Sequence, residues 1–162
     1  MTPPARAAAD GCLFCAIAAG SEPAALVWRD DRVCAFLDAR PVFKGHVLVV
    51  PRAHVPTLLE LPAPEIGPFF AAVQRVAAAV EGALEADGTF VAANNKVSQS
   101  VPHLHVHVVP RRRKDGLRGF FWPRVPYASD QERDDFAARI AAALPVAAPA
   151  APPTPAPAPA FE

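Results

Sequence analysis

Alternating and periodic apolar positions along the chain predict about five strands and two principal helices. A charged turn separates two short apolar runs, at 25–30 and 32–38, which predicts a hairpin. The stretch 45–51 is rich in β-branched residues and closes on a proline, as strands do. Two further strands are predicted over 89–95 and 102–110, joined by a polar loop.

Apolar residues that recur every three or four positions predict a long helix between these pairs of strands. Prolines mark its start, and Gly88 lies just beyond its end. Its apolar positions are Ile66, Phe69, Phe70, Val73, Val76, Val80 and Leu84. A final helix begins with the capping-box pattern Ser129-x-x-Glu132. The side chains that it is expected to bury are Phe136, Ile140 and Leu144.

The order of these elements predicts an α+β fold. It contains no βαβ alternation, so the expected architecture is a five-stranded antiparallel sheet with one long central helix and a C-terminal helix. At 162 residues, 52% of them hydrophobic, the chain is long enough for one globular domain. We expect that domain over 11–144, between a flexible N-terminus at 1–10 and a disordered Ala/Pro-rich tail at 145–162.

Charge and hydropathy indicate which partners and which location to expect. The 16 basic and 16 acidic residues balance, so no global field attracts nucleic acid or an anionic membrane, and neither is expected as a partner. No apolar run approaches the roughly 20 residues of a membrane helix, and none resembles a signal peptide. Three cysteines, an odd number, fit a reducing compartment, so the predicted location is cytoplasmic.

Three of the five histidines fall within the stretch "HLHVH", at His103, His105 and His107. Successive side chains of a strand face opposite sides, so the three imidazoles would share one face, with neighbours about 7 Å apart. The apolar residues between and after them are expected to face the core. From the residues alone, this row is a solvated histidine-rich strand face, a metal-binding row or a catalytic group.

The segment "NNKVSQSVPHLHVHVVPR" (94–111) resembles the signature of the histidine triad superfamily, whose core is His-x-His-x-His followed by two apolar residues. "CLFC" (12–15) and "AFLDARPVFKGHVLVVPRAH" (35–54) match the order and spacing of that family. The resemblance covers about residues 11–112. The third histidine, where the uridylyltransferase branch carries Gln, indicates the nucleotide hydrolase branch, of the bacterial zinc-containing type.

The resemblance implies a two-step hydrolysis of nucleotides. His105 would be the nucleophile that attacks the α-phosphorus, and water would then hydrolyse the nucleotidyl-histidine. His107 and Ser100 would donate hydrogen bonds to phosphate oxygens whose charge changes in the transition state. If a backbone carbonyl holds one nitrogen of the nucleophile, its tautomer is set and its other nitrogen can face the phosphate.

The resemblance also assigns residues around the phosphate loop and the nucleoside. Gln99, together with Asn94 or Asn95, would hold the phosphate and shape the loop. The family commonly carries Gly where this chain has Ser98, and the loop is shorter here, so the two asparagines stay alternatives. Asp38 would accept hydrogen bonds from the ribose hydroxyls. The positions implied around the base, for which core packing is the alternative, are Leu13, Phe14, Ile17 and Phe36.

A structural zinc ion is a further implication of the family. Its ligands would be Cys12, Cys15, His54 and His103. Two thiolates and two imidazoles form a suitable tetrahedral set for Zn²⁺, and the alternative is an ordinary pair of cytosolic thiols. Mg²⁺ is a further candidate cofactor with polyphosphate substrates. Cys34 is expected to be an inert core residue, and His46 either structural or near the phosphate.

The densest basic and aromatic stretch is "RRRKDGLRGFFWPR" (111–124). It is either a solvated surface or a binding surface, where 111–114 bind distal phosphates and 120–122 stack on a base or form a dimer contact. The predicted function is hydrolysis of purine nucleotides by a homodimer. Candidate substrates are dinucleoside polyphosphates of the diadenosine tetraphosphate type, or nucleoside phosphoramidates. The alternative is a non-catalytic nucleotide- or zinc-binding signalling module.

Overall fold

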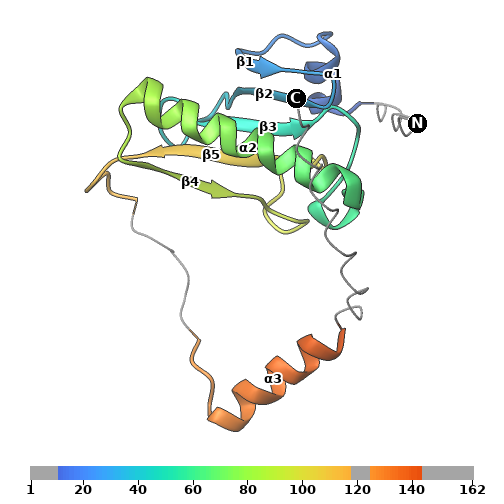
Figure 1. The fold of residues 1–162 in the computed structure, drawn as a ribbon, viewed down its shortest axis with the longest axis vertical. Coiled ribbons are helices and arrows are strands. Elements are labelled where there is room, and N and C mark those ends of the chain that lie inside the picture. Colours follow the sequence, from blue (N-terminus) through green and yellow to red (C-terminus); the bar gives the residue numbers. More distant parts are fainter. Residues whose placement is uncertain (1–10, 118–124, 144–162) are drawn as a thin grey trace, which may run out of the picture. The chain divides into compact units, whose positions relative to one another are not determined.

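The computed structural model describes residues 11–117 and 125–143 (Figure 1). The chain divides into two compact units, one ending at Leu117 and the other beginning at Arg118. The strands, all in the first unit, are β1 (Leu26–Arg29), β2 (Val33–Leu37), β3 (Val47–Pro51), β4 (Gly88–Ala92) and β5 (Val106–Arg111). The helices are α1 (Leu13–Ala19), the 3₁₀ turn η1 (Leu58–Glu60), α2 (Ala63–Leu84) and, in the second unit, α3 (Asp130–Ala143). The termini 1–10 and 145–162, whose disorder was predicted, lie outside the described residues.

The five strands form one antiparallel sheet in the order β1-β2-β3-β5-β4, which confirms the predicted α+β architecture (Figure 1). The hairpin over 25–38 is β1 and β2, and β3 ends at Pro51 as expected. β5 is the last strand in sequence, yet it lies between β3 and β4. Leu48 pairs with His107 across β3 and β5, so the start of β3 lies beside the histidine segment.

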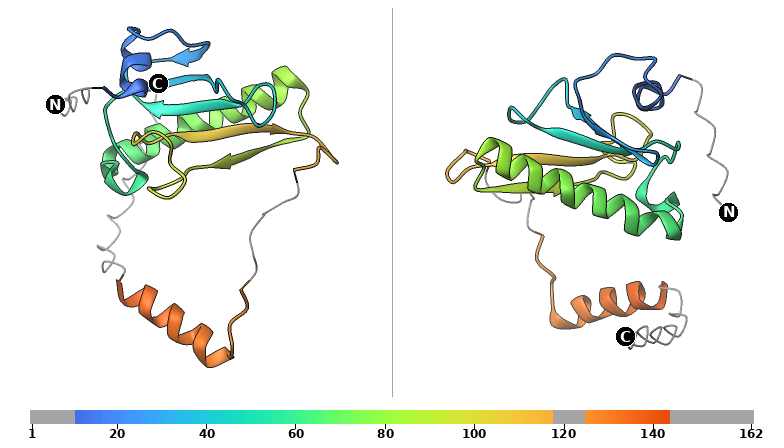
Figure 2. Two further views of the ribbon diagram at one scale, coloured as in Figure 1. Left: turned by 180° about the vertical axis from the view of Figure 1, so that it is seen from behind. Right: turned by 45° about the horizontal axis from the view of Figure 1, so that its top comes forward.

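Each face of the sheet packs against a different helix. α2 covers one face, where buried side chains of β2, β3 and β5 meet its Phe69, Val73, Val76 and Val80. α1 packs against the other face with Phe14 and Ile17, and the two helices lie on opposite sides of the sheet (Figure 2). Leu104, Val106 and Val108 point to the α2 face. The expected orientation of these apolar residues is therefore confirmed.

The ends of α2 differ in part from the sequence prediction. Pro64 lies in the first turn, where the missing N–H costs no helical hydrogen bond. Three of the seven predicted apolar positions, Ile66, Phe70 and Leu84, are exposed. The helix ends at Leu84 and is capped by Glu85, which adopts a left-handed conformation with φ of 50°. Gly88 instead begins β4.

α3 begins as its capping box predicts. The Glu132 N–H donates to Ser129 Oγ at 3.1 Å, and the Glu132 carboxylate accepts from the Ala128 N–H. Within its own unit, α3 leaves Phe136 and Ile140 exposed, so their predicted burial is not provided by that unit. The described part of this unit holds no second helix or strand for them to pack against. Leu144 lies outside the described residues.

No helix among the described residues combines the length and the apolar character needed to cross a membrane.

Candidate active site and metal centre

The three histidines keep their alternation although only the last lies within a strand. β5 begins at Val106, four residues later than predicted. Before it, the His103 N–H donates to the Val101 carbonyl at 2.8 Å and the Leu104 N–H to the Val55 carbonyl at 2.6 Å. The first contact belongs to a bend over 101–103, and the second ties Leu104 to the segment after β3. Leu104 therefore still faces α2, while the imidazoles gather on the side of α1.

His105 is held in one tautomer by the backbone. Its Nδ1 lies 2.7 Å from the His103 carbonyl oxygen, which can only accept, so Nδ1 carries the proton. The Nε2 lone pair makes no hydrogen bond within the described residues. The ring is buried, and the Phe14 ring packs edge-on against it at a centroid distance of 5.2 Å. An imidazole whose second nitrogen keeps its lone pair can act as a nucleophile.

His107 belongs to a second imidazole pair, which also contains a residue that sequence reasoning left undecided. His46 Nε2 lies 3.0 Å from His107 Nδ1, and Asp38 Oδ2 lies 3.5 Å from His46 Nδ1. Burial, together with the charges of His105 and His46, lowers the pKa of His107 to about 4. Burial also lowers the pKa of His46. Both rings are therefore neutral near pH 7.

The predicted metal ligands converge from three separate segments of the chain. Cys12 and Cys15 lie at the start of α1, and His54 follows β3. His103 Nδ1 lies 3.4 Å from Cys12 Sγ and 3.5 Å from Cys15 Sγ, and His54 Nδ1 lies 3.4 Å from Cys15 Sγ. One ligand atom from each of the four residues lies within 4.8 Å of the others.

This donor set fits zinc. With tetrahedral angles and ordinary Zn–S and Zn–N bond lengths, sulfur and nitrogen ligands lie about 3.5 Å apart, which matches the three distances above. His103 Nε2 donates to the Pro51 carbonyl at 2.8 Å, so the Nδ1 lone pair faces the thiols. A metal-ligating histidine typically holds its second nitrogen in this way. Burial lowers the pKa of His103 to about 4, which keeps the ring available as a ligand.

The loop 94–100 uses most of its amide groups to hold its own shape. Gln99 accepts from the Lys96 N–H at 2.8 Å and donates to the Pro56 carbonyl at 2.6 Å. Asn95 accepts from the Leu58 N–H at 3.0 Å, whereas Asn94 donates to the Ser98 carbonyl at 3.3 Å. These contacts favour loop-shaping for Gln99 and Asn95. They leave the second N–H of the Asn94 amide for an anionic ligand, since only one is given to the Ser98 carbonyl.

Among the residues expected around the nucleoside, those at the base positions differ in exposure. Leu13 is exposed, whereas Phe14, Ile17 and Phe36 are buried in the cluster between α1 and the sheet. Burial of these three side chains in a core cluster agrees with the core-packing alternative, and a role around the base stays a prediction. Asp38 accepts from the Arg40 N–H at 2.8 Å through Oδ1. Cys34 is fully buried in β2, and burial raises the pKa of its thiol, which agrees with an inert core residue.

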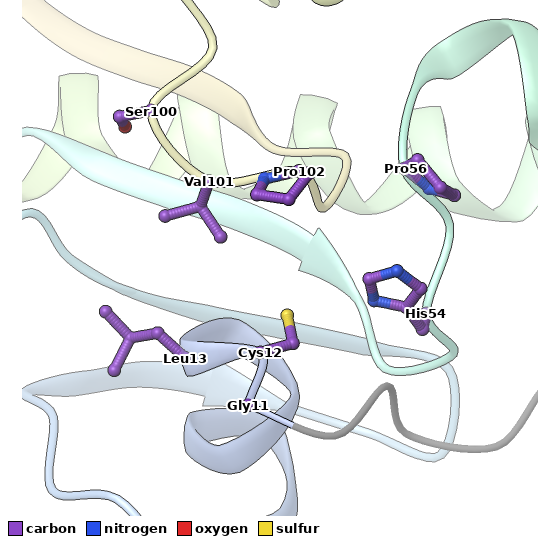
Figure 3. Close-up of a pocket in the computed structure, with 8 residues that line it drawn as sticks. All are labelled: Gly11, Cys12, Leu13, His54, Pro56, Ser100, Val101 and Pro102. Carbon is purple, nitrogen blue, oxygen red and sulfur yellow. The ribbon is translucent and has the colours of Figure 1, made fainter.

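A pocket lies beside the metal-ligand cluster (Figure 3). Cys12 and His54 point toward each other on one side of it, and the loop carrying Ser100 forms the other side. Leu13 also lines the pocket. The Ser100 hydroxyl makes no hydrogen bond within the described part of the chain. Two residues predicted to contact the nucleotide, Leu13 and Ser100, therefore line the same pocket as two predicted zinc ligands.

The basic stretch lies away from the triad. β5 runs from the histidines toward Arg111, which is about 20 Å from His105 at the rise of an extended strand. The Arg111 guanidinium binds Asp115 at 2.6 and 2.9 Å, and Arg112 donates to the Leu84 and Glu85 carbonyls at the end of α2. These structural contacts do not support the prediction that this tract binds distal phosphates through its first two arginines. Residues 120–122 lie outside the described residues.

The class of protein is defined by an α+β fold whose antiparallel sheet carries a histidine cluster on the face opposite the long helix. The family model described as the HIT domain matches residues 19–114. The chain belongs to the HIT, or histidine triad, family.

Two solved structures show the same fold. The chain is similar to a member of the HIT family from Bacillus subtilis, at 34% identity and a TM-score of 0.77 over 85% of this chain and 100% of the other. It is also similar to a zinc-bound histidine triad family protein from Mycobacterium smegmatis, at 35% identity and a TM-score of 0.63 over 83% and 98% of the two chains.

Curated relatives include proteins with named activities. "Protein hit" of Bacillus subtilis is 38% identical over 78% of this chain and 88% of its own length. An adenylylsulfatase of Arabidopsis thaliana is 32% identical over 65% of this chain and 55% of its own length. An asymmetrical bis(5'-nucleosyl)-tetraphosphatase of Schizosaccharomyces pombe is 34% identical over 54% and 50%.

Proposed function

We propose that the protein is a nucleotide hydrolase that cleaves at the α-phosphate through a covalent nucleotidyl-histidine on His105. One observation carries the proposal. The His103 carbonyl accepts the His105 Nδ1 proton at 2.7 Å, so the Nε2 lone pair is the nitrogen left for attack. Membership of the HIT family, with relatives named for adenylylsulfatase and tetraphosphatase activities, supports hydrolysis of nucleotides.

The reaction begins when His105 Nε2 attacks the α-phosphorus in line with the leaving group. The N–P bond forms as the bond to the leaving phosphate, nucleotide or amine breaks. Water then attacks the nucleotidyl-histidine, which releases a nucleoside monophosphate and restores the neutral ring. His107 and Ser100 donate to the phosphate oxygens, where one well-placed donor is typically worth about 3 kcal/mol in the transition state.

Asp38 and the pocket beside the metal-ligand cluster orient the nucleoside. Asp38 accepts from the ribose hydroxyls, Leu13 contacts the base, and the second amide N–H of Asn94 donates to the phosphate. Leu13 and Ser100 line the same pocket, which supports their assignment to one ligand. The candidate substrates are dinucleoside polyphosphates and nucleoside phosphoramidates. The purine preference, the homodimer, the cytoplasmic location and a role for Mg²⁺ stay predictions.

A zinc ion in this protein would be structural. Cys12, Cys15, His54 and His103 would hold it, and it would cross-link the start of α1 to the segment before β5. His103 connects this site to the nucleophile, because its ring faces the thiols while its carbonyl orients His105. The matching ligand distances and the zinc-bound relative support this assignment.

A direct test uses two substrates. Wild-type protein and the His105→Ala variant are incubated with diadenosine tetraphosphate and, separately, with an adenosine phosphoramidate, and products are identified by chromatography. We expect AMP among the wild-type products with at least one substrate and no turnover by a folded His105→Ala variant. Normal turnover by that variant would exclude His105 as the nucleophile. Nucleotide binding without turnover by wild type would favour the non-catalytic module.

A further inference from the structure

His46 is a buried imidazole that the proposed reaction does not use. Only 2% of its surface is exposed. It directly follows Gly45, whose φ of +93° is a conformation that glycine adopts readily. The pairing of Leu48 with His107 brings the start of β3 against β5. The sheet register therefore places the His46 ring beside the third histidine of the triad, with ring centroids 5.1 Å apart.

The surroundings of His46 set its tautomer. The Val42 backbone N–H, which can only donate, points at His46 Nδ1 from 3.3 Å. A proton on Nδ1 would oppose this N–H and would have only Asp38 Oδ2 as acceptor, at 3.5 Å, beyond ordinary hydrogen-bond length. Nδ1 therefore accepts, and the neutral ring carries its proton on Nε2.

This tautomer determines that of the neighbouring ring. His46 Nε2 donates to His107 Nδ1 at 3.0 Å, so His107 Nδ1 is an acceptor and its own proton lies on Nε2. His107 Nε2 makes no hydrogen bond within the described residues. Its N–H is thus available to a ligand. Burial lowers the pKa of both rings, which agrees with a neutral pair near pH 7.

We propose that His46 is a positioning residue that keeps His107 in the Nε2–H tautomer, so that His107 donates to the substrate phosphate. The proposal rests on the proposed function, because it gives His107 a phosphate to contact. Without His46, the His107 ring could carry its proton on either nitrogen and could rotate. Only part of the population would then present a donor, and turnover would fall while nucleotide binding through Asp38 and the pocket continued.

Two substitutions of His46 separate positioning from packing. His46→Leu keeps side-chain volume but removes the donor, whereas His46→Gln keeps an N–H that can reach His107 Nδ1. We expect kcat of the Leu variant to fall roughly tenfold to a hundredfold, less than on loss of a donor that touches phosphate itself, with KM changed little. The Gln variant should recover most of kcat. Thr89→Val is a matched control, because it removes a hydrogen bond to Glu81 at the other end of the sheet.

The decisive readout is the tautomer of His107, measured by ¹⁵N NMR of the histidine side chains. Wild type, Thr89→Val and His46→Gln should show the Nε2–H form, and His46→Leu should show the Nδ1–H form or a mixture. An Nδ1–H form in wild type, or an unchanged His107 in His46→Leu, would overturn the proposal. The wild-type spectrum alone tests which nitrogen of His107 carries the proton, even if the Leu variant does not fold. The spectrum gives the same answer if wild type hydrolyses neither substrate. Failure of the proposed hydrolysis and failure of the proposed role of His46 are therefore distinguishable.

Discussion

Burial of neutral His107 makes the stability of the protein depend on pH. Its pKa is about 4 in the folded chain, against an ordinary value of 6.5. Between these values the unfolded chain binds a proton that the folded chain does not bind, so stability falls as pH is lowered. At pH 5 an unfolded imidazole is almost fully protonated and the folded one is mostly neutral. The free energy of unfolding at pH 5 is therefore about 2 kcal/mol lower than at pH 7.5 because of this one group.

His107→Asn isolates this contribution. Asparagine does not titrate, and its side-chain oxygen can still accept from His46. Urea unfolding of both proteins at pH 7.5 and pH 5.0 gives four free energies of unfolding. The loss between the two pH values should be about 2 kcal/mol smaller in the variant. Contributions common to both proteins, including protonation of zinc ligands, cancel in this comparison. Equal losses in the two proteins would refute a buried neutral His107.

Three further outcomes follow from the structure. Removing zinc with a chelator, or replacing Cys15 by Ser, should lower the free energy of unfolding by about 3 kcal/mol and remove the metal found by elemental analysis; unchanged metal content contradicts the site. Gly45→Ala should lower the free energy of unfolding in urea by at least about 1 kcal/mol, because of the positive φ and because the added Cβ would meet Leu84 Cδ1. Replacing Arg113 and Lys114 by Ala should leave KM for diadenosine tetraphosphate unchanged, and a severalfold rise would restore a substrate-binding role to this tract.

The strands and the long helix could be predicted because their signals are local. Alternation, β-branched residues and Pro51 identify the hairpin and β3, and the three-to-four-residue period identifies α2. α1 was missed because it has only seven residues and Cys12 makes no side-chain cap. The start of β5 was misplaced because alternation continues before the ladder, held by the Leu104 bond to Val55. Alternation of polar and apolar residues alone cannot distinguish a strand of the sheet from a neighbouring segment that lies outside the sheet.

The residues of the site could be predicted from the sequence, but the contacts between them could not. The motif named the triad and all four metal ligands, which the structure brings together. The link between His46 and His107 depends on the register of β3 against β5, which the sequence does not display. The structural role of Arg112 likewise depends on where β5 ends relative to α2. Local patterns name candidate side chains, whereas long-range pairing decides which of them touch.

The central claim, attack by His105 on an α-phosphorus, is tested most directly by trapping the intermediate. Wild-type protein is mixed with diadenosine tetraphosphate or the adenosine phosphoramidate, quenched during turnover without acid, and measured by intact-protein and peptide mass spectrometry. The account predicts an acid-labile adduct of one adenylyl group on the peptide containing His105, and none in His105→Ala. Turnover with no adduct at any quench time, or an adduct on a different residue, would contradict it.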